Sequence, residues 1–486
     1  MERRDFIKAG AAAAAVAASK PLFGWQGANN RVRMAVIGCG NRAGRVFDSL
    51  ARHSDVQWVG ACEVNEARLA GFMNASRQTY KLENVVDYRK ILDRKDVDAV
   101  LIGTPDFSHA RIMVDAVSAG KDVYVEKPAS NSIPRINGML DAFSKGKQIV
   151  QVGTQQRSWD YFQEAKKIVD SGQLGTISHV TITQPGTYAR AREAEAPVPA
   201  GLDWKMWQLA GMPLGAPDKA FKPSRLGFRA WYEYGSGLIG DWGAHHVDVA
   251  LWFMDADHKQ PIKTMANGTF LAVPNADPEM VPDTFSISWL YDNFLLSFTN
   301  AEVYMDPAKE NPIENWGVYF IGNRGSLQVN RQGYVVRGVV PHVVRKQGAP
   351  PPPTAGGVTL GAGGAQIAQT APGAPAGAPG AGGRGGRQGG GPGGPGGGGR
   401  DGGAAAAPTV PLEPKAVVNP KGGVEEDYPL DAHTRNFLDS VKSRQKPAAT
   451  MEVGYNSALP CLIALEALKT NKILGWDAAK RETKVL

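Results

Sequence analysis

The feature that most constrains the fold is a set of closely spaced glycines between a predicted strand and a predicted helix, in the stretch VRMAVIGCGNRAG at residues 32–44. Gly38, Gly40 and Ala43 fit the pattern G-x-G-x-x-A. The first glycine permits a tight turn, the second lets the backbone approach a pyrophosphate, and Ala43 lets the helix pack closely on the strand. Because strand and helix flank the glycines as required, the pattern predicts a Rossmann-type dinucleotide site. A similar turn that binds a methyl donor is an alternative.

An acidic residue at the end of the next predicted strand favours NAD as the cofactor. A carboxylate at Glu63 would accept hydrogen bonds from the adenosine ribose hydroxyls and repel the 2′-phosphate of NADP. Asn41 and Arg42, which follow the glycines, complete the cofactor-binding residues expected on this loop. Arg42 and Arg68 could also contact a phosphate, so NADP is the less favoured alternative.

The pattern of the sequence changes along the chain and predicts five segments. Strand-like and helical stretches alternate first, as in a parallel, doubly wound sheet, and strand-like stretches separated by turn residues follow. The expected fold class is α/β: an N-terminal Rossmann dinucleotide-binding domain plus a C-terminal α+β domain with an open, mostly antiparallel sheet. The segments are a signal peptide (1–30), the Rossmann NAD-binding domain (31–153), an α+β substrate and oligomerisation domain (154–346), a disordered Gly/Pro/Ala-rich insertion (347–413) and C-terminal helices that complete the fold (414–486).

The first thirty residues resemble a twin-arginine export signal. Arg3 and Arg4 precede Phe6, Ile7 and Lys8, and a short run rich in alanine follows. This apolar run is too short to span a bilayer, so no stable membrane insertion is expected. We therefore expect a protein that is exported in its folded state, to the periplasm or outside the cell. An ordinary N-terminal helix is the alternative.

Charge and cysteine content narrow the classes of function. The formal net charge is +7, but no run of Lys and Arg is interleaved with aromatic residues, which argues against nucleic-acid binding. Cys39, Cys62 and Cys461 are odd in number and irregularly spaced. They therefore argue against a disulfide framework and against a cysteine zinc site, and buried thiols are expected.

The stretch GDWGAHHVD, residues 240–248, concentrates titratable side chains. On a helix that begins near Asp241, that residue shares one face with His245 and Asp248. His246 points elsewhere, so the neighbouring histidines cannot both bind one ion and no metal site is predicted, although Asp241 and His245 with remote ligands stay an alternative. His245 suits a general base, because its ordinary pKa lies near neutrality. A packed core histidine is the alternative for His245 and the expected role of His246.

Three motifs together resemble the Gfo/Idh/MocA oxidoreductases: GTPDFSH (103–109), GKDVYVEKPAS (120–130) and the GDWGAHHVD stretch, all after a Rossmann start. The resemblance implies a Rossmann domain followed by an α/β domain with an open, largely antiparallel sheet. In the family that sheet commonly serves as the oligomer interface, so a homo-oligomer, dimer or tetramer, is expected.

The resemblance also implies which residues form the active site. Lys127 of the Glu-Lys-Pro triplet would act with Asp241 and His245 as the catalytic set. His245 is the first choice for the general base and Lys127 for the charge beside the alkoxide, and these two roles could be exchanged. Further residues are expected at the cofactor: Thr104, Pro105, His109, Glu126 and Lys127 itself. His109 is equally well explained as a helix-start residue.

The expected function is an NAD(P)-dependent oxidoreductase that transfers a hydride between the hydroxyl of a sugar, polyol or glycoside and a nicotinamide cofactor. One alternative is an NAD-dependent glycosidase that oxidises, eliminates and re-reduces with a retained cofactor. The other is a non-catalytic protein that binds nucleotide or sugar. Four tryptophans near the predicted substrate side could stack on sugar rings, although at least half are expected in the core: Trp204, Trp207, Trp231 and Trp242.

Overall fold

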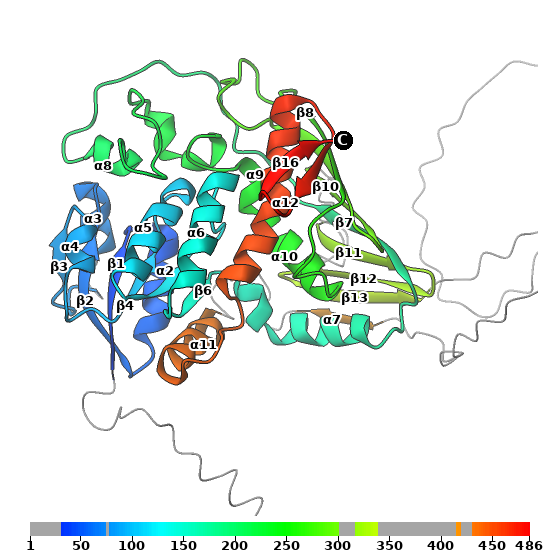
Figure 1. Ribbon diagram of the computed structural model, residues 1–486, viewed down its shortest axis with the longest axis horizontal. Helices are drawn as coiled ribbons and strands as arrows, with labels where there is room; N and C mark the ends of the chain where they lie inside the picture. Colours follow the sequence, from blue (N-terminus) through cyan, green and yellow to red (C-terminus); the bar gives the residue numbers. More distant parts are fainter. Residues whose placement is uncertain (1–30, 74–76, 301–315, 339–414, 419–429) are drawn as a thin grey trace, which may run out of the picture. The chain divides into compact units, whose positions relative to one another are not determined.

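The computed structural model of the chain describes residues 31–73, 77–300, 316–338, 415–418 and 430–486 (Figure 1). All of them belong to one compact unit of the chain. The predicted signal peptide and the predicted Gly/Pro/Ala-rich insertion lie outside the described residues.

The N-terminal part forms a sheet with helices between its strands. The strands are β1 (Val32–Ile37), β2 (Val56–Cys62), β3 (Glu83–Val85), β4 (Ala99–Ile102), β5 (Asp122–Val125) and β6 (Val150–Val152). The helices are α2 (Asn41–Ala51), α3 (Glu66–Phe72), α4 (Arg89–Leu92), α5 (Asp106–Ser118) and α6 (Ile133–Lys145). The strands are parallel and lie in the order β3-β2-β1-β4-β5-β6. The chain therefore turns from one half of the sheet to the other between β1 and β4, where open α/β sheets bind ligands.

Both faces of this sheet are buried, as its apolar strands predict. Met34 and Val36 of β1 belong to the core that contains α2, whereas Ala35 and Ile37 belong to the core that contains α5 and α6. The face with α2 is completed by α11 (Leu430–Ser443), which comes from the far end of the sequence and packs beside α2.

The C-terminal part forms a larger, mixed sheet. Its strands are β7 (Ile177–Thr183), β8 (Lys263–Thr269), β9 (Thr284–Leu290), β10 (Leu295–Thr299), β11 (Gly317–Gly322), β12 (Gly325–Asn330), β13 (Gly333–Gly338), β14 (Lys415–Val418), β15 (Leu474–Asp477) and β16 (Glu482–Val485). They lie in the order β14-β13-β12-β11-β7-β10-β9-β8-β15-β16. The pair β7 and β10 is parallel, and the other pairs are antiparallel. The expected fold class is thereby confirmed.

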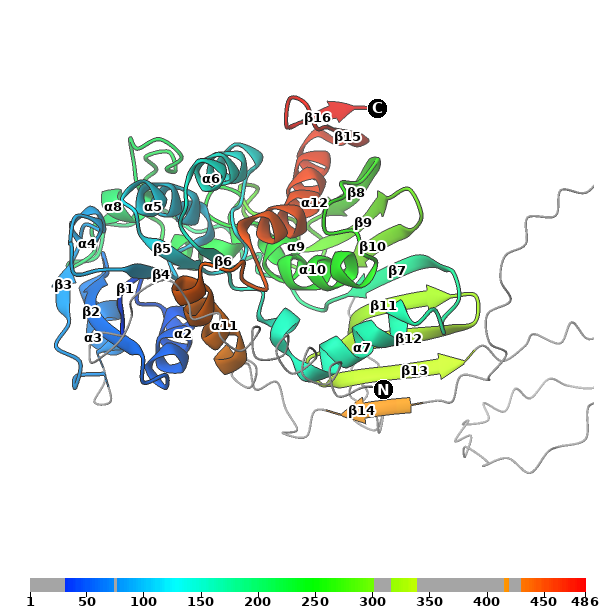
Figure 2. The same cartoon turned by 60° about the horizontal axis from the view of Figure 1, so that its bottom comes forward.

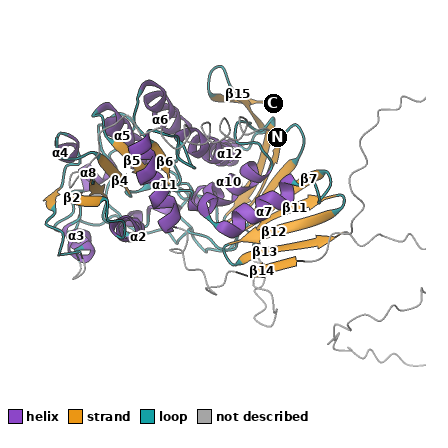
Figure 3. Cartoon of the chain, turned by 90° about the horizontal axis from the view of Figure 1, so that it is seen from below, coloured by secondary structure: helices purple, strands orange, loops and turns teal. Residues whose placement is uncertain are grey.

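Helices cover one face of this larger sheet. The helical segments of this part are α7 (Asp160–Asp170), α8 (Trp204–Gln208), α9 (Gly237–Asp241), α10 (Gly243–Phe253) and α12 (Met451–Thr470), with 3-10 turns η1 (Gln155–Ser158), η2 (Pro223–Leu226) and η3 (Phe228–Ala230). Figures 2 and 3 show α7, α10 and α12 along the same face of the sheet. Strand β9 shows the resulting alternation, because Ile287 and Trp289 are buried while Ser286 and Ser288 are not. No helix among the described residues is both long and apolar enough to cross a bilayer.

A long excursion of the chain, residues 184–236, leaves the larger sheet after β7 and reaches the Rossmann part (Figure 1). It is anchored just after β2 by two backbone hydrogen bonds. The Glu66 N–H donates to the carbonyl of Gly201 at 2.9 Å, and the Asp203 N–H donates to the carbonyl of Val64 at 2.9 Å. The excursion therefore supplies one wall of any site at the carboxyl ends of the parallel strands.

Candidate active site

The two glycines of the loop after β1 meet different requirements. Gly38 has φ +86°, and a Cβ there would lie 2.7 Å from Thr104 Cγ2 and 2.8 Å from the Thr104 backbone nitrogen. Gly40 caps α2 in an extended conformation, and no protein atom lies within 4 Å of the position of a Cβ. The first glycine is therefore required by the fold itself, whereas the second keeps space open at the N-terminus of a helix, where a pyrophosphate binds.

Glu63 lies where the sequence places it, at the end of β2 and beside the glycine loop. Its carboxylate accepts hydrogen bonds from the Cys39 N–H at 2.8 Å and the Asn65 N–H at 3.0 Å. Burial raises the pKa of Glu63, and these two N–H donors oppose that rise. Each oxygen has a further lone pair, so the carboxylate can hold the loop and still accept a ribose hydroxyl.

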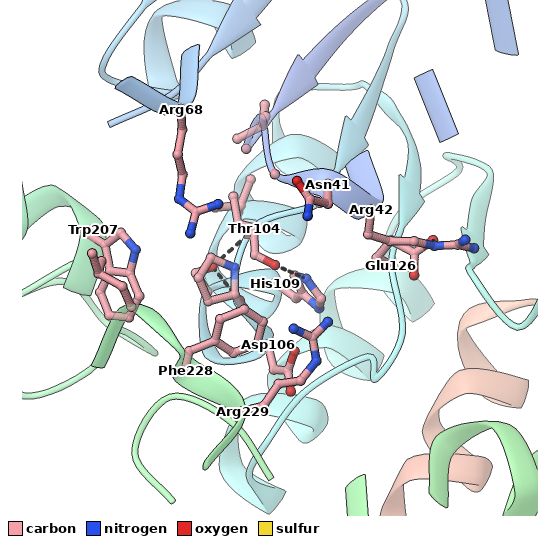
Figure 4. Close-up of a pocket in the computed structure, with 18 of the residues that line it drawn as sticks. Asn41, Arg42, Arg68, Thr104, Asp106, His109, Glu126, Trp207, Phe228 and Arg229 are labelled. Carbon is pink, nitrogen blue, oxygen red and sulfur yellow. Dashed lines mark hydrogen bonds and ion pairs between the residues drawn. The ribbon is translucent and has the colours of Figure 1, made fainter. Parts of the chain in front are cut away.

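A pocket of about 640 Å³ extends from this loop to α9 and α10 of the C-terminal part, and Figure 4 shows some of the residues that line it. That volume is typical of small-molecule sites. Nearly all of the residues predicted from the sequence line it: Gly38, Gly40, Asn41, Arg42, Glu63, Thr104, Pro105, His109, Glu126, Lys127, Asp241 and His245. Ala43 does not; it is fully buried and packs against Gly103, where a Cβ would lie 2.6 Å from that of Ala43. Ala43 therefore serves the close contact between helix and strand that the motif requires.

Lys127 and Asp241 line the pocket together and form an ion pair. Lys127 Nζ donates to Asp241 Oδ1 at 2.6 Å and to the Asp241 carbonyl at 3.1 Å. Both side chains are largely buried, with 11% and 7% exposure. Burial alone would raise the pKa of Asp241, but the charges of Lys127 and Arg229 outweigh it and hold that pKa well below its ordinary value. Asp241 is therefore an ionised carboxylate that holds the Lys127 ammonium in place.

His245 lines the same pocket from α10 and is 3% exposed. Burial, together with the positive charges of Lys127 and Arg331, holds the pKa of His245 well below its ordinary value of 6.5. Its Nδ1 has no hydrogen-bond partner among the described residues. The imidazole is therefore neutral at physiological pH and can accept a proton.

Comparison with known proteins gives the family. Residues 32–154 match the model of an oxidoreductase family described as an NAD-binding Rossmann fold, and residues 160–293 match the C-terminal alpha/beta domain of the same family. The chain belongs to the Gfo/Idh/MocA oxidoreductase family.

Several relatives in this family are dehydrogenases of cyclic polyols and sugars. An inositol 2-dehydrogenase of Salmonella typhimurium is 32% identical over 125 residues, which are 25% of this chain and 36% of that one. Levoglucosan dehydrogenase of Pseudarthrobacter phenanthrenivorans is 28% identical over 188 residues, 39% of this chain and 38% of that one. The chain thus spans less than two fifths of the length of these two relatives.

Solved structures agree in fold over nearly the whole chain. Scyllo-inositol dehydrogenase from Lactobacillus casei, solved with NAD(H) and scyllo-inositol, has a TM-score of 0.54 and 17% identity and covers 92% of this chain and 99% of its own. A levoglucosan dehydrogenase in complex with NADH and levoglucosan has a TM-score of 0.55 and 16% identity and covers 94% of this chain and 99% of its own. At these identities the comparison establishes the Gfo/Idh/MocA fold.

Around the Gfo/Idh/MocA motifs the structure brings in residues that the sequence did not indicate. The Tyr188 hydroxyl donates to Asp241 Oδ2 at 2.5 Å, and Arg229 Nε donates to Asp241 Oδ1 at 3.1 Å. Asp106, at the first turn of α5, is 2% exposed and lines the pocket as well. Tyr188 and Arg229 come from the irregular excursion 184–236, which carries no periodic pattern that could have pointed to them. Asp106 stands in the quoted GTPDFSH motif, next to Pro105, and could have been singled out there.

Two of the predicted cofactor residues hold the site together through the protein itself. Arg42 Nε donates to Glu126 Oε1 at 2.9 Å, which ties the start of α2 to the end of β5. The two ring nitrogens of His109 lie 2.9 Å from the Pro128 carbonyl and 2.8 Å from the Thr104 carbonyl. Burial lowers the pKa of His109, so its neutral ring donates to one of them at a time. His109 therefore joins the turn after β4 to the Glu-Lys-Pro turn, in addition to lining the pocket.

The prediction of one face shared by three residues of the GDWGAHHVD stretch is wrong in part. The helix does not begin near Asp241: α9 ends there, and α10 begins at Gly243 after Trp242. Asp248 turns away from the pocket and forms a buried ion pair with Arg157 at 2.8 Å. A buried carboxylate needs a cation as its partner, and here that cation is Arg157 of η1. The residue spacing within the GDWGAHHVD stretch contains no information about η1.

The remaining predictions for aromatic and metal-binding residues can be compared with the structure. His246 bonds to Gln184 at 2.9 Å and stacks on Trp242, as expected of a core histidine. Trp204, Trp207 and Trp231 are buried in one hydrophobic cluster, and Trp207 and Trp242 line the pocket. Within the described part of the chain, no group of three or more His, Cys, Asp or Glu residues is placed to hold a metal ion.

Proposed function

We propose that this protein is an NAD-dependent oxidoreductase that transfers a hydride between a hydroxyl of a sugar, polyol or glycoside and the nicotinamide. The observation that carries the proposal is the Lys127 ammonium held 2.6 Å from Asp241 at the carboxyl edge of the dinucleotide-binding sheet, in one pocket with a neutral His245. The inositol and levoglucosan dehydrogenases among the relatives support the class of substrate.

The residues of the glycine loop fit a dinucleotide. The space beside Gly40 is open, the N-terminus of α2 faces it, and Glu63 lies beside the loop with lone pairs free for a ribose. When bound, the nicotinamide supplies the hydride acceptor. The side chains on the other side of the pocket from the loop must bind the substrate, accept its proton and stabilise the alkoxide.

Oxidation of an alcohol needs a proton acceptor and a cation beside the developing alkoxide. Neutral His245 can take the hydroxyl proton, because its ring lines the pocket; its Nδ1 is buried and has no partner among the described residues, so the other ring nitrogen, Nε2, is the one available to a substrate. Lys127 can hold the same oxygen and stabilise its negative charge, while Asp241 and Tyr188 keep the ammonium in position. Lys127 and His245 line the same pocket, so the exchange of these two roles, with Lys127 as the base, is the alternative.

We expect the pH dependence of kcat/KM to differ from that of an ordinary histidine base. Because the pKa of His245 lies well below 6.5, protonation of His245 should not lower activity as the pH falls through 6 and should do so only in more acid solution. Burial, opposed by the charge of Arg229, raises the pKa of Asp106 to about 7, so an inflection near neutrality should come from Asp106. The measurement is kcat/KM from pH 4.5 to 9 for the wild type, Asp106→Asn and His245→Asn. An inflection between pH 6 and 7 that survives in Asp106→Asn and vanishes in His245→Asn would contradict this assignment.

Glu63 is expected to set the preference for NAD over NADP. Glu63→Gln keeps the size of the side chain but removes the charge that repels a 2′-phosphate, so the ratio of kcat/KM for NAD to that for NADP should fall roughly tenfold or more. Arg68, which extends into the pocket from α3, is placed to assist NADP once the carboxylate is neutral (Figure 4). Glu83→Gln, which neutralises an acidic residue on β3 outside the pocket, is the matched control. An unchanged ratio in Glu63→Gln would assign the preference to another residue.

The proposed function is tested by denaturing the purified protein, identifying any nucleotide that is released, and assaying turnover of polyols, sugars and glycosides with added NAD. Net NADH formation supports the dehydrogenase. Solvent deuterium incorporated beside the oxidised carbon, with aglycone release and no net NADH, would instead identify a glycosidase. Bound nucleotide with neither reaction on any of these substrates would favour a binding protein.

Two further properties belong to this proposal. We propose export by the twin-arginine route from the signal-like residues Arg3 and Arg4, and a homo-oligomer formed through the outer face of the larger sheet. Replacing both arginines by lysine should leave the protein in the cytoplasm, as fractionation would show. A monomer in sedimentation would rule out the oligomer.

A further inference from the structure

We propose that the substrate oxidised in this pocket carries a carboxylate beside the reacting hydroxyl, so that a sugar acid is preferred over the corresponding neutral sugar. The inference rests on the proposed function, because it names the substrate class of the same site. It is drawn from two arginines at the substrate end, Arg229 and Arg190, neither of which the sequence motifs include.

The first observation is an excess of positive charge next to Asp241. Lys127 and Arg229 both donate to the same oxygen, Asp241 Oδ1, at 2.6 and 3.1 Å, and the other oxygen accepts from neutral Tyr188. One carboxylate therefore balances two cations. The nearest second carboxylate, Asp106, is 2% exposed and only partly ionised near neutral pH, because burial raises its pKa to about 7. An anion at this end would complete the balance of charge.

The second observation is that Arg229 has donors left over. Its Nε is engaged by Asp241, but its terminal nitrogens make no hydrogen bond to a described residue, and 38% of the side chain is exposed. Figure 4 shows its guanidinium in the pocket beside Asp106. The two terminal nitrogens of a guanidinium form a planar fork that matches the two oxygens of a carboxylate.

The third observation is a second arginine on the segment that brings in Tyr188. The chain from Tyr188 to Arg190 runs into an isolated β-bridge between Ala191 and Ala276. Ala189 is buried, whereas Tyr188 and Arg190 both line the pocket, as expected of alternate residues in an extended chain. The Arg190 side chain has no partner among the described residues. A second guanidinium thus lines the same pocket.

The positions of these groups indicate where the carboxylate lies on the substrate. Because Lys127 and Arg229 meet at one oxygen of Asp241, a hydroxyl held by the first and an anion held by the second lie within the span of one sugar ring. A phosphate on the same ring would share the anionic chemistry, but a planar fork matches a carboxylate more closely. The inference therefore commits to a carboxylate and leaves the phosphate to the experiment.

The experiment compares matched ligands on the NAD-loaded protein: glucose, glucuronate and glucose 6-phosphate, and galactose with galacturonate. Calorimetry measures binding, and absorbance of NADH measures turnover. We expect a uronate to bind roughly tenfold or more tightly than its neutral partner, since hydrogen bonds between charged groups are the strong ones. Equal affinity within both pairs, no detectable binding of either uronate, or a preference for the phosphate would overturn the proposal.

The same data separate this inference from the proposed function. Turnover of neutral sugars without a preference for uronates would support the proposed oxidoreductase function and contradict the inference that the substrate carries a carboxylate. Tight binding of a uronate with no NADH formed would support recognition of a carboxylate and count against the proposed oxidoreductase function.

Variants locate the effect. Arg190→Gln should lower the ratio of uronate to neutral-sugar affinity roughly tenfold, and Arg229→Gln should lower it at least as much. Arg192→Gln removes the same charge two residues along the chain, from a side chain that does not line the pocket, and should leave the ratio unchanged. An equal loss in Arg192→Gln would show that overall charge rather than a built site attracts the anion. A ratio that survives both pocket variants would overturn the proposal.

Discussion

Replacing Lys127 by methionine should lower kcat at saturating NAD by roughly 10²–10³-fold, the loss seen when one preorganised donor to a developing oxyanion is removed. The fold should survive the change, because Asp241 keeps Arg229 and Tyr188 as partners at 3.1 and 2.5 Å. The measurement is a steady-state assay on the substrate that the wild type turns over best, with NAD binding followed in parallel by fluorescence.

The matched control is Lys147→Met, an exposed lysine in the same domain. A Lys127→Met enzyme within tenfold of the wild type would mean that another cation of the pocket, of which Arg229 is the nearest, stabilises the alkoxide. A variant that binds NAD but not substrate would mean that Lys127 acts mainly in binding, since loss of a transition-state interaction lowers kcat rather than only raising KM.

The second large effect is expected at the glycine loop. Replacing Gly38 should lower the stability of the protein, whereas replacing Gly40 should lower its affinity for NAD. Gly38→Ala places a side chain at φ +86° and against the backbone of Thr104, so the free energy of unfolding should fall by roughly 2–4 kcal/mol. Gly40→Ala meets no protein atom within 4 Å and has an allowed backbone, so its stability should change by less than about 1 kcal/mol.

The loss of affinity for NAD should be specific to Gly40→Ala, the variant that keeps its stability. A Cβ at Gly40 stands where the backbone must approach the pyrophosphate, so NAD affinity should fall at least roughly tenfold in Gly40→Ala although the protein is stable. Denaturant unfolding and titration with NAD give the two quantities. If Gly40→Ala binds NAD like the wild type, the dinucleotide does not cross the loop at this residue, and the assignment of the cofactor site is wrong.

Much of the dinucleotide half could be predicted because its signals are local. The turn at Gly38, the open space at Gly40 and the carboxylate at Glu63 each follow from residues within one strand–loop–helix unit, and the structure places them in one pocket. The triplet with Lys127 and the stretch with Asp241 could be assigned only through the resemblance to a family. Neither segment contains a local pattern that says the two meet.

The part that could not be predicted comes from contacts between distant segments. Arg229 and Tyr188 belong to an excursion whose helical segments are short, and their distance from Asp241 depends on how that excursion is anchored after β2. Asp248 was grouped with Asp241 by helical spacing, yet it bonds to Arg157 from another element. Helical spacing predicts the side of the helix on which a residue lies, but it does not predict which charged residue of another element packs against that side.

By itself, then, the sequence determined the class of fold, the dinucleotide loop and the identities of the candidate base, cation and carboxylate, because each depends on backbone geometry or on a motif read along the chain. Only the tertiary structure decided that Lys127 is held by Asp241, that His245 is neutral, and that Arg190 and Arg229 line the pocket. Those properties are electrostatic: they depend on burial and on the distances between charges brought together from β5, α9 and the excursion, and no one segment of the sequence contains them.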